Sequence, residues 1–183
     1  MRLALIPHGN SLRPPGLHIR VGLERQTPTA LVLRYEVSGA VDVILVQAIT
    51  QTAQADNLWK HTCFEVFVAP STGEAYFEFN LSPSSQWAAY RFQGYRTGMS
   101  VIHEIRAPLI TLSQDGQLVL SASLDLGSLL EFAAEPSWRV GVSAVIEDSD
   151  GNLSYWALTH PQAKPDFHHP DSFVIHLAAP EPA

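Results

Sequence analysis

The sequence has one cysteine, few basic residues and no long apolar run. Because Cys63 has no second cysteine to pair with, the fold cannot depend on a disulfide within the chain. Lysine and arginine together number 11 in 183 residues, and the net charge is −7. Binding to nucleic acid or to an anionic membrane surface needs a basic patch. Neither is therefore an expected partner.

Segments long enough to enter a membrane are also absent from the sequence. A membrane-crossing helix needs about 20 consecutive, chiefly apolar residues, and no stretch approaches that length. The N-terminal sequence MRLALIPHGNS has a short apolar run that ends at Pro7. This run is briefer than the hydrophobic region of a signal peptide. A cytoplasmic location is the resulting expectation.

Charged residues are scarce as well, at 16% of the chain, whereas hydrophobic residues make up 46%. This composition is typical of an ordered, soluble globule and excludes intrinsic disorder. A chain of 183 residues is long enough for one substantial core. No repeat, low-complexity segment or linker divides it, so we expect a single domain over residues 1–183.

Short segments rich in aromatic and β-branched residues recur along the chain, with turn residues between them. The predicted strands are Leu3–Ile6 at an edge, His18–Leu23, Leu31–Val37, Val43–Ile49, Thr62–Ala69, Glu74–Leu81, Gln86–Phe92, Ile105–Leu112, Leu118–Leu124, Trp138–Glu147, Leu153–Leu158 and Ser172–Leu177. Asp125–Phe132 is the one segment that we predict to be helical. About ten strands with one short helix indicate an all-β fold, an antiparallel β-sandwich of the jelly-roll or immunoglobulin-like kind.

The most informative stretch is the strand meander from Asn57 to Arg96. Side chains alternate between the two faces of a strand, so Glu65 and Glu78 both lie opposite the apolar core face. Folding the chain about the turn at Pro70–Gly73 brings these two acids roughly opposite each other. Like charges opposite each other on a sheet are destabilising. The arrangement therefore needs a reason.

A second turn, at Ser82–Ser85, returns the chain as the third strand of the meander. We expect this turn to place Trp87 near Asn80 and Arg91 on the same face as the acids. Such a face has more aromatic area than a solvated sheet face needs. It is typical of the floor of a ligand groove, in which rings stack and carboxylates accept hydroxyl hydrogen bonds. A plainly solvated face, or a cation held between the carboxylates, are the alternatives.

The segment from Leu58 to Asn80 resembles family-nine carbohydrate-binding modules and the wider DOMON-like superfamily of sugar- and haem-binding β-sandwiches. In those modules a strand of the form L-W-x-x-x-x-x-E-x-F is followed by one reading Y-x-E-F-x, and both patterns occur here. In the sugar-binding relatives, two tryptophans enclose a terminal sugar while charged and amide side chains hold its hydroxyls. The resemblance implies Trp59 as the first tryptophan and Trp156 as its partner, with Trp87 as a second choice for the partner.

The sequence thus predicts a non-catalytic domain that binds a carbohydrate-like small molecule. The predicted ligand-binding residues are Trp59, Glu65, Glu78, Asn80, Trp87, Arg91 and Trp156. Core packing is the alternative for every tryptophan, and it is favoured for Trp138, which begins an alternating strand. Cys63 is expected to be a small buried hydrophobe rather than a catalytic thiol.

Three other functions remain open at this stage. The haem-binding relatives hold iron through a methionine with a histidine or lysine, so haem is the alternative cofactor, with Met99, His160 and Lys164 as candidate ligands. An enzyme would use Glu65 and Glu78 as the acid/base pair of a glycosidase. In a protein-interaction domain, the same sheet face would dock a partner.

A second polar cluster occupies the predicted loop from Thr159 to Asp171, THPQAKPDFHHPD. Its prolines predict a stiff loop, and we expect Asp166 and Asp171 to fix it by accepting backbone hydrogen bonds. Its adjacent histidines show no known metal-ligand spacing. If the loop packs at the same end as Trp59, it forms the rim of the groove.

Overall fold

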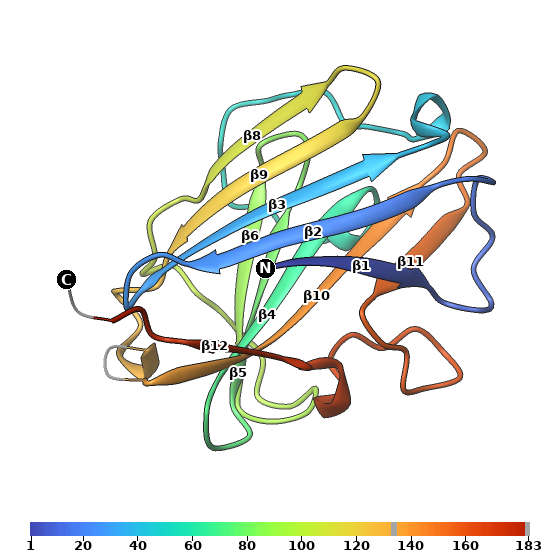
Figure 1. The fold of residues 1–183 in the computed structure, drawn as a ribbon. Helices are drawn as coiled ribbons and strands as arrows, with labels where there is room; N and C mark the ends of the chain where they lie inside the picture. The colour runs from blue at the N-terminus through green and yellow to red at the C-terminus, as the bar shows by residue number, and fades with distance from the viewer. Residues whose placement is uncertain (133–134, 182–183) are drawn as a thin grey trace.

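The computed structural model describes residues 1–132 and 135–181, and nearly all of their regular structure is β-strand (Figure 1). The strands in this part of the chain are β1 (Arg2–Pro7), β2 (His18–Arg25), β3 (Ala30–Ser38), β4 (Cys63–Pro70), β5 (Tyr76–Leu81), β6 (Trp87–Phe92), β7 (Ser100–Val101), β8 (Leu109–Gln114), β9 (Leu118–Asp125), β10 (Ser137–Glu147), β11 (Leu153–Ala157) and β12 (Ile175–Ala178). The predicted all-β class is confirmed.

Helical structure in the described residues is limited to four short 3₁₀ helices. They are η1 (Val41–Val43), η2 (Leu58–Lys60), η3 (Leu130–Phe132) and η4 (Pro170–Ser172). The predicted helix over Asp125–Phe132 is therefore reduced to the three residues of η3. No helix in this part of the protein has the length and apolar character needed to cross a membrane.

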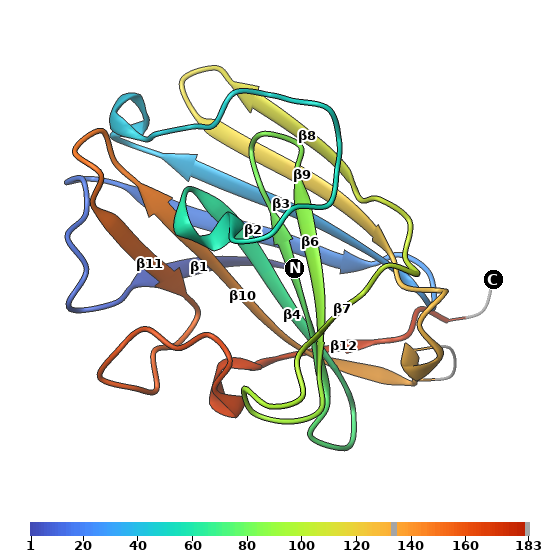
Figure 2. The ribbon, with the colours of Figure 1, turned by 180° about the vertical axis from the view of Figure 1, so that it is seen from behind.

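The strands pair antiparallel in the order β7-β6-β5-β4-β10-β11-β1-β2-β3-β9-β8, and β12 also pairs with β10. The strand β1 joins the two layers, because Arg2 to Leu5 pair with β2 whereas Ile6 and Pro7 pair with β11. We call β1, β2, β3, β9 and β8 the first sheet, and the remaining strands the second sheet. Figures 1 and 2 show these two sheets facing each other. Within the first sheet β1 is the edge strand, as predicted, because Arg2 to Leu5 pair with β2 alone.

The core fills the space between the two sheets. It takes alternate residues from each strand, such as Leu31, Leu33 and Tyr35 from β3 and Phe64 and Val66 from β4, all of them fully buried. Trp138 is also fully buried there, as expected. The core therefore takes up one face of each sheet and leaves the other face of each sheet on the outside.

The outer face of the second sheet carries a smaller apolar cluster of its own. Its buried members are Phe67, Ala69, Tyr76, Ala88, Tyr90, Phe92 and Phe173. Three long connections cross this face, namely residues 44–62 with η2, residues 93–99 and residues 158–174, and Figure 2 views the molecule from this side. Because loops cover it, this face can enclose a cavity.

The apolar run Val43–Ile49 is not the buried strand that the sequence predicts. Only Ile44 forms a ladder contact in this run, an isolated bridge to Asp148, and Leu45 and Ile49 are exposed. A strand needs a neighbour along its whole length, and here the chain crosses from one layer to the other. The segment becomes part of the first of the three connections.

Candidate functional site

A cavity of about 640 Å³ opens on the outer face of the second sheet. The three connections form its walls, and the sheet forms its floor. Its lining residues are Asp56, Asn57, Trp59, Glu65, Glu78, Tyr90, Phe92, Arg96, Met99, Val101, Val145, Tyr155, Pro165, Phe167 and His168. Three of the predicted ligand-binding residues, Trp59, Glu65 and Glu78, are in this set.

Glu65 and Glu78 lie on the same face of neighbouring strands, as predicted. Their pairing differs from the prediction by two residues, because Glu65 faces Asn80 and Glu78 faces Phe67 across the ladder. A shift of two residues preserves the face, since side chains alternate with a period of two. The two acids are thus diagonal neighbours rather than direct partners.

Both acids are buried, with only 3% of Glu65 and 6% of Glu78 exposed. The hydroxyl of Ser143 donates to Oε2 of Glu65 over 2.9 Å. Burial and the charge of Glu78 raise the pKa of Glu65 to about 8, against the effect of this hydrogen bond. Burial raises the pKa of Glu78 to about 7, against the hydrogen bond from Asn80 and the charge of Arg96. The pair therefore retains a proton near neutral pH.

Asn80 lies beside the acids and is fully buried. Its Nδ2 donates to Oε1 of Glu78 over 2.8 Å, and its Oδ1 has no hydrogen-bond partner in the described part of the chain. It is not among the described residues that line the cavity. The amide therefore supports Glu78 from below the lining.

The third strand of the meander presents the opposite face to that predicted. Trp87 pairs with Leu81 and points into the main core, where it is almost fully buried. Arg91 shares this side and forms ion pairs with Glu104 and Glu131. The predicted placement of Trp87 and Arg91 beside the acids is therefore wrong.

A one-residue change in register accounts for this inversion. Tyr90 pairs with Glu78, and Phe92 pairs with Tyr76, so β6 presents its two aromatic rings to the cavity. A register shift of one residue moves every side chain of a strand to the other face. The turn before β6 contains Ser85 at a φ of 72°, a left-handed backbone conformation that a serine does not predict.

The two tryptophans expected to enclose a ligand occupy very different environments. Trp59 lies in η2, lines the cavity and is 45% exposed. Trp156 is 2% exposed and packs in the main core, where its Nε1 donates to Ser154. Its predicted role as the second platform is not supported, because β11 turns the neighbouring Tyr155 toward the cavity instead.

The loop from Thr159 to Asp171 forms part of the cavity rim. This was the prediction for a loop that packs at the same end as Trp59, and both line the same cavity. Pro165, Phe167 and His168 are its lining residues. Asp166 accepts a backbone hydrogen bond from His168 over 3.1 Å, which confirms its expected role in fixing the loop. The Asp171 side chain is largely exposed and lies 3.7 Å from His169 instead.

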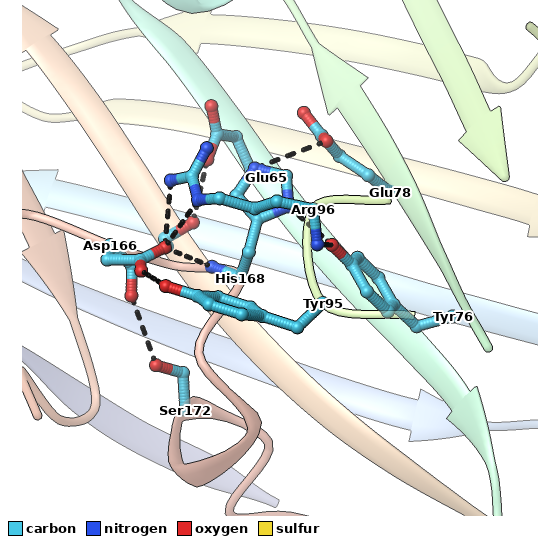
Figure 3. A network of polar contacts seen from close by, with 9 residues as sticks. Glu65, Tyr76, Glu78, Tyr95, Arg96, Asp166, His168 and Ser172 are labelled. Carbon is cyan, nitrogen blue, oxygen red and sulfur yellow. Dashed lines mark hydrogen bonds and ion pairs between the residues drawn. The ribbon is translucent and has the colours of Figure 1, made fainter. Parts of the chain in front are cut away.

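Asp166 also ties this loop to the connection that follows β6 (Figure 3). Its Oδ1 accepts from Nε and Nη2 of Arg96, at 3.2 Å and 2.8 Å, and its other oxygen accepts from the hydroxyl of Tyr95. Burial opposes ionisation, but the hydrogen bonds from Tyr95 and Arg96 hold the pKa of Asp166 below its ordinary value. One carboxylate thus joins two walls of the cavity.

His168 completes this contact network beside the acids. The Tyr76 hydroxyl and Nδ1 of His168 are 2.8 Å apart, and Nε2 of His168 lies 3.7 Å from Oε2 of Glu78. Burial and the charge of Arg96 lower the pKa of His168 to about 4, so the ring is neutral near pH 7. A second cavity, of about 330 Å³, shares His168 with the first and is also lined by Tyr76.

We expect Asp166→Asn to loosen the cavity wall without unfolding the protein. Asparagine keeps the shape of the side chain but removes the charge that holds Arg96, and the guanidinium is half exposed. Amide hydrogen exchange at Arg96 and His168 is expected to accelerate by about tenfold, since their backbone N–H groups bond within this network. Asp150→Asn, in the β10–β11 turn, is the matched control. Unchanged exchange at both amides would show that Asp166 does not hold the wall.

Two of the three candidate haem ligands lie away from the lining. Met99 lines the cavity, whereas His160 and Lys164 are not among its described lining residues. Nε2 of His160 lies 2.9 Å from the carbonyl oxygen of Ile6, outside the cavity. In the described part of the chain, no three His, Cys, Asp or Glu side chains are grouped so that they could hold a metal ion.

Cys63 is fully buried on β4, two residues before Glu65. Burial and the charge of Glu65 raise the pKa of its thiol well above the ordinary value. A reactive cysteine needs a thiolate and an electropositive setting. The environment is therefore that of the small buried hydrophobe expected from the sequence.

Solved structures with the same architecture identify the fold. A family 9 carbohydrate-binding module from Caldicellulosiruptor kristjanssonii, in complex with glucose, superposes with a TM-score of 0.54 at 11% sequence identity, covering 98% of this chain and 85% of the module. The same organism's module in complex with cellotriose gives a TM-score of 0.56 at 12% identity, covering 95% and 80% of the two chains. The chain has the fold of the family 9 modules. This fold was expected from the resemblance at Leu58 to Asn80.

A further similar structure is that of a protein from Bacteroides uniformis whose suggested role is carbohydrate binding. It superposes with a TM-score of 0.67 at 13% identity, and the match covers 97% of this chain and 85% of the other. Comparison of the sequence with family models gives no match, and comparison with curated proteins gives none either. The likeness is therefore one of fold.

Several residues that line the cavity were not predicted from the sequence. Tyr90, Phe92 and Tyr155 alternate with residues that the sequence analysis placed on this face, and Arg96 and Phe167 come from connections. The sequence showed that side chains alternate between the two faces of each strand, but it did not show which alternating set faces the cavity. Nothing in the residue types of Gly94-Tyr95-Arg96 indicated that this segment would line a cavity.

Proposed function

We propose that this protein is a non-catalytic domain that binds a carbohydrate-like small molecule in the cavity over the second sheet. The observation that carries the proposal is the exposed indole of Trp59 in one cavity with the buried acids Glu65 and Glu78. The cavity volume of about 640 Å³ lies within the range of small-molecule sites. Structures of the same fold in complex with glucose and with cellotriose give further support.

The chemistry of the lining suits a polyhydroxylated ring. The apolar face of a sugar stacks on an indole, and Trp59 offers one that is held by a short helix at the cavity rim. Ionised carboxylates accept hydroxyl hydrogen bonds, whereas a protonated carboxyl also donates one. Because the Glu65 and Glu78 pair retains a proton near pH 7, it supplies both kinds of partner.

The placement of the acids favours binding over hydrolysis. A glycosidase positions its two carboxyl groups on either side of the scissile bond. Here Glu65 and Glu78 stand on the same face of adjacent strands, so both approach a ligand from the floor of the cavity. We therefore expect no turnover of chromogenic glycosides by the wild-type protein.

Trp59→Ala tests the proposal directly. We expect the variant to bind glucose, cellobiose or cellotriose at least about tenfold more weakly than the wild type in isothermal titration calorimetry, because the stacking surface is gone. Circular dichroism is expected to be unchanged, since the side chain is not part of the core. Leu130→Ala removes another exposed apolar side chain, one that is not among the described lining residues, and serves as the control.

The two ways in which this test can fail have different meanings. Equal affinity of Trp59→Ala and the wild type would remove the indole as the binding platform. Absence of binding by the wild type across glucose, cellobiose and cellotriose would contradict the carbohydrate function itself.

A further inference from the structure

The charge inside the cavity is unbalanced. Three acids line it, Asp56, Glu65 and Glu78, and Arg96 is the only lysine or arginine among the described lining residues. The Arg96 guanidinium is already paired with Asp166 at 2.8 Å, and His168 is neutral near pH 7. In the described contacts, no lysine or arginine forms an ion pair with Glu65 or Glu78 on the cavity floor.

The hydrogen-bond acceptors on this floor are also incompletely used. In the described contacts, Ser143 donates to Oε2 of Glu65 and Asn80 donates to Oε1 of Glu78. The second oxygen of Glu78 has only the neutral His168 ring, at 3.7 Å. Each acid thus keeps one carboxyl oxygen for which the described part of the chain supplies no close donor.

Asn80 gives an independent indication that a donor is missing. Its side chain is fully buried, and its Oδ1 has no partner in the described part of the chain. Its ladder partners are Glu65 on one side and Ala88 on the other, and Glu78 lies two residues before it. Once both acids are ionised, neither they nor the alanine can donate a hydrogen bond to this oxygen. A buried acceptor without a donor costs about 1–3 kcal/mol, so a donor supplied at this face is favourable.

We propose that, within the carbohydrate site proposed above, Glu65 and Glu78 receive a positively charged primary amine, so that the site prefers an amino sugar to a neutral sugar of similar size. An ammonium group carries three donors, one positive charge and no acceptor. It therefore matches two acids that form no ion pair with a lysine or arginine and that each keep one oxygen without a close donor. The inference rests on the proposed function and narrows it to one class of sugar.

Uptake of the amine is coupled to release of a proton. Near pH 7 the acid pair retains a proton, and an ammonium beside it favours the doubly ionised form. One carboxyl O–H bond breaks, its proton passes to the solvent, and the ammonium keeps its own hydrogens. The other titratable or charged groups around the pair are Cys63 on β4, Tyr76 on β5, Tyr90 on β6, Asp56, Arg96, Asp166 and His168.

Calorimetry on the wild-type protein tests the preference. Glucosamine and 6-amino-6-deoxyglucose are compared with glucose and with N-acetylglucosamine, whose amide is neutral, at pH 7.0. We expect at least one amino sugar to bind about tenfold or more tightly than both neutral sugars. Repeating the titration in two buffers of different ionisation enthalpy is expected to show net proton release for the amino sugar and none for glucose.

Glu65→Gln and Glu78→Gln are expected to weaken amino-sugar binding more than glucose binding, so that the ratio of the two affinities falls to about one. Glu24→Gln makes the same charge change at an exposed position on β2 and is expected to preserve the preference. Equal binding of amino and neutral sugars by the wild type would overturn the amine site and leave the carbohydrate function standing. Binding of no sugar at all would overturn both proposals.

Discussion

Glu65→Gln is expected to raise the free energy of unfolding at pH 8 by several kcal/mol and to flatten its dependence on pH. In the wild type, burial and the charge of Glu78 raise the pKa of Glu65 to about 8. Glutamine has the same shape, carries no charge at any pH and still accepts the hydrogen bond from Ser143. The variant thus keeps the packing and removes the unfavourable ionisation.

The direction of the pH dependence follows from proton binding in the two states. In the unfolded chain the acid loses its proton near its ordinary pKa, about 4.3, whereas the folded protein holds it up to about pH 8. Between these values the folded state binds more protons, so the free energy of unfolding falls as pH rises, by up to about 1.4 kcal/mol per pH unit for each such acid. The stabilisation is fully present below pH 4 and is lost by pH 8.

The most informative window lies between pH 6.5 and pH 8. His168 has the opposite effect at lower pH, because its pKa is lowered to about 4 and its contribution to stability is lost as pH falls below 6.5. Urea denaturation at several pH values in this window gives the slopes for the wild type and Glu65→Gln. Glu24→Gln is the control and is expected to retain the wild-type slope. An unchanged slope in Glu65→Gln would show that the acid is ionised in the folded protein throughout this range.

Trp156→Ala is expected to lower the free energy of unfolding by about 3–5 kcal/mol, the usual cost of deleting a large buried aromatic side chain. Its ring is 2% exposed within the main core, so the deletion leaves a cavity that neighbouring strands cannot fill. Trp59→Ala is expected to change the same free energy by less than about 1 kcal/mol, because the Trp59 side chain is 45% exposed.

Chemical denaturation of both tryptophan variants at one pH separates the two environments. Trp156→Phe is a milder control that retains an aromatic ring and is expected to lose less stability than Trp156→Ala. If Trp156→Ala unfolded like the wild type, the indole would not belong to the core. It would then become a candidate for the ligand platform that the resemblance implied.

These two variants also distinguish ligand binding from core packing, the two roles that the sequence left open for both tryptophans. A residue that only binds ligand changes affinity and not stability, whereas a core residue changes stability first. We expect Trp59 to show the first behaviour and Trp156 the second. The two readouts are independent because the side chains lie in different layers.

Part of the candidate site could be predicted because it depends on alternation alone. Glu65 and Glu78 remain on one face although their pairing was misjudged by two residues, since an even shift preserves the face. Trp87 and Arg91 were misplaced by a shift of one residue, which no pattern within β6 reveals, because both faces of this strand carry large side chains. The five-residue turn before it, with Ser85 in the left-handed region, sets the register.

The sequence by itself determined the all-β class, the meander and the shared face of the two acids, because strand propensity and a period of two are local properties of the chain. Only the tertiary structure decided that Trp156 belongs to the core and Tyr155 to the cavity, and that Arg96 and Asp166, 70 residues apart, close its wall. These outcomes depend on register and on contacts between distant connections. Both are set by packing across the whole sandwich, which no short stretch of sequence encodes.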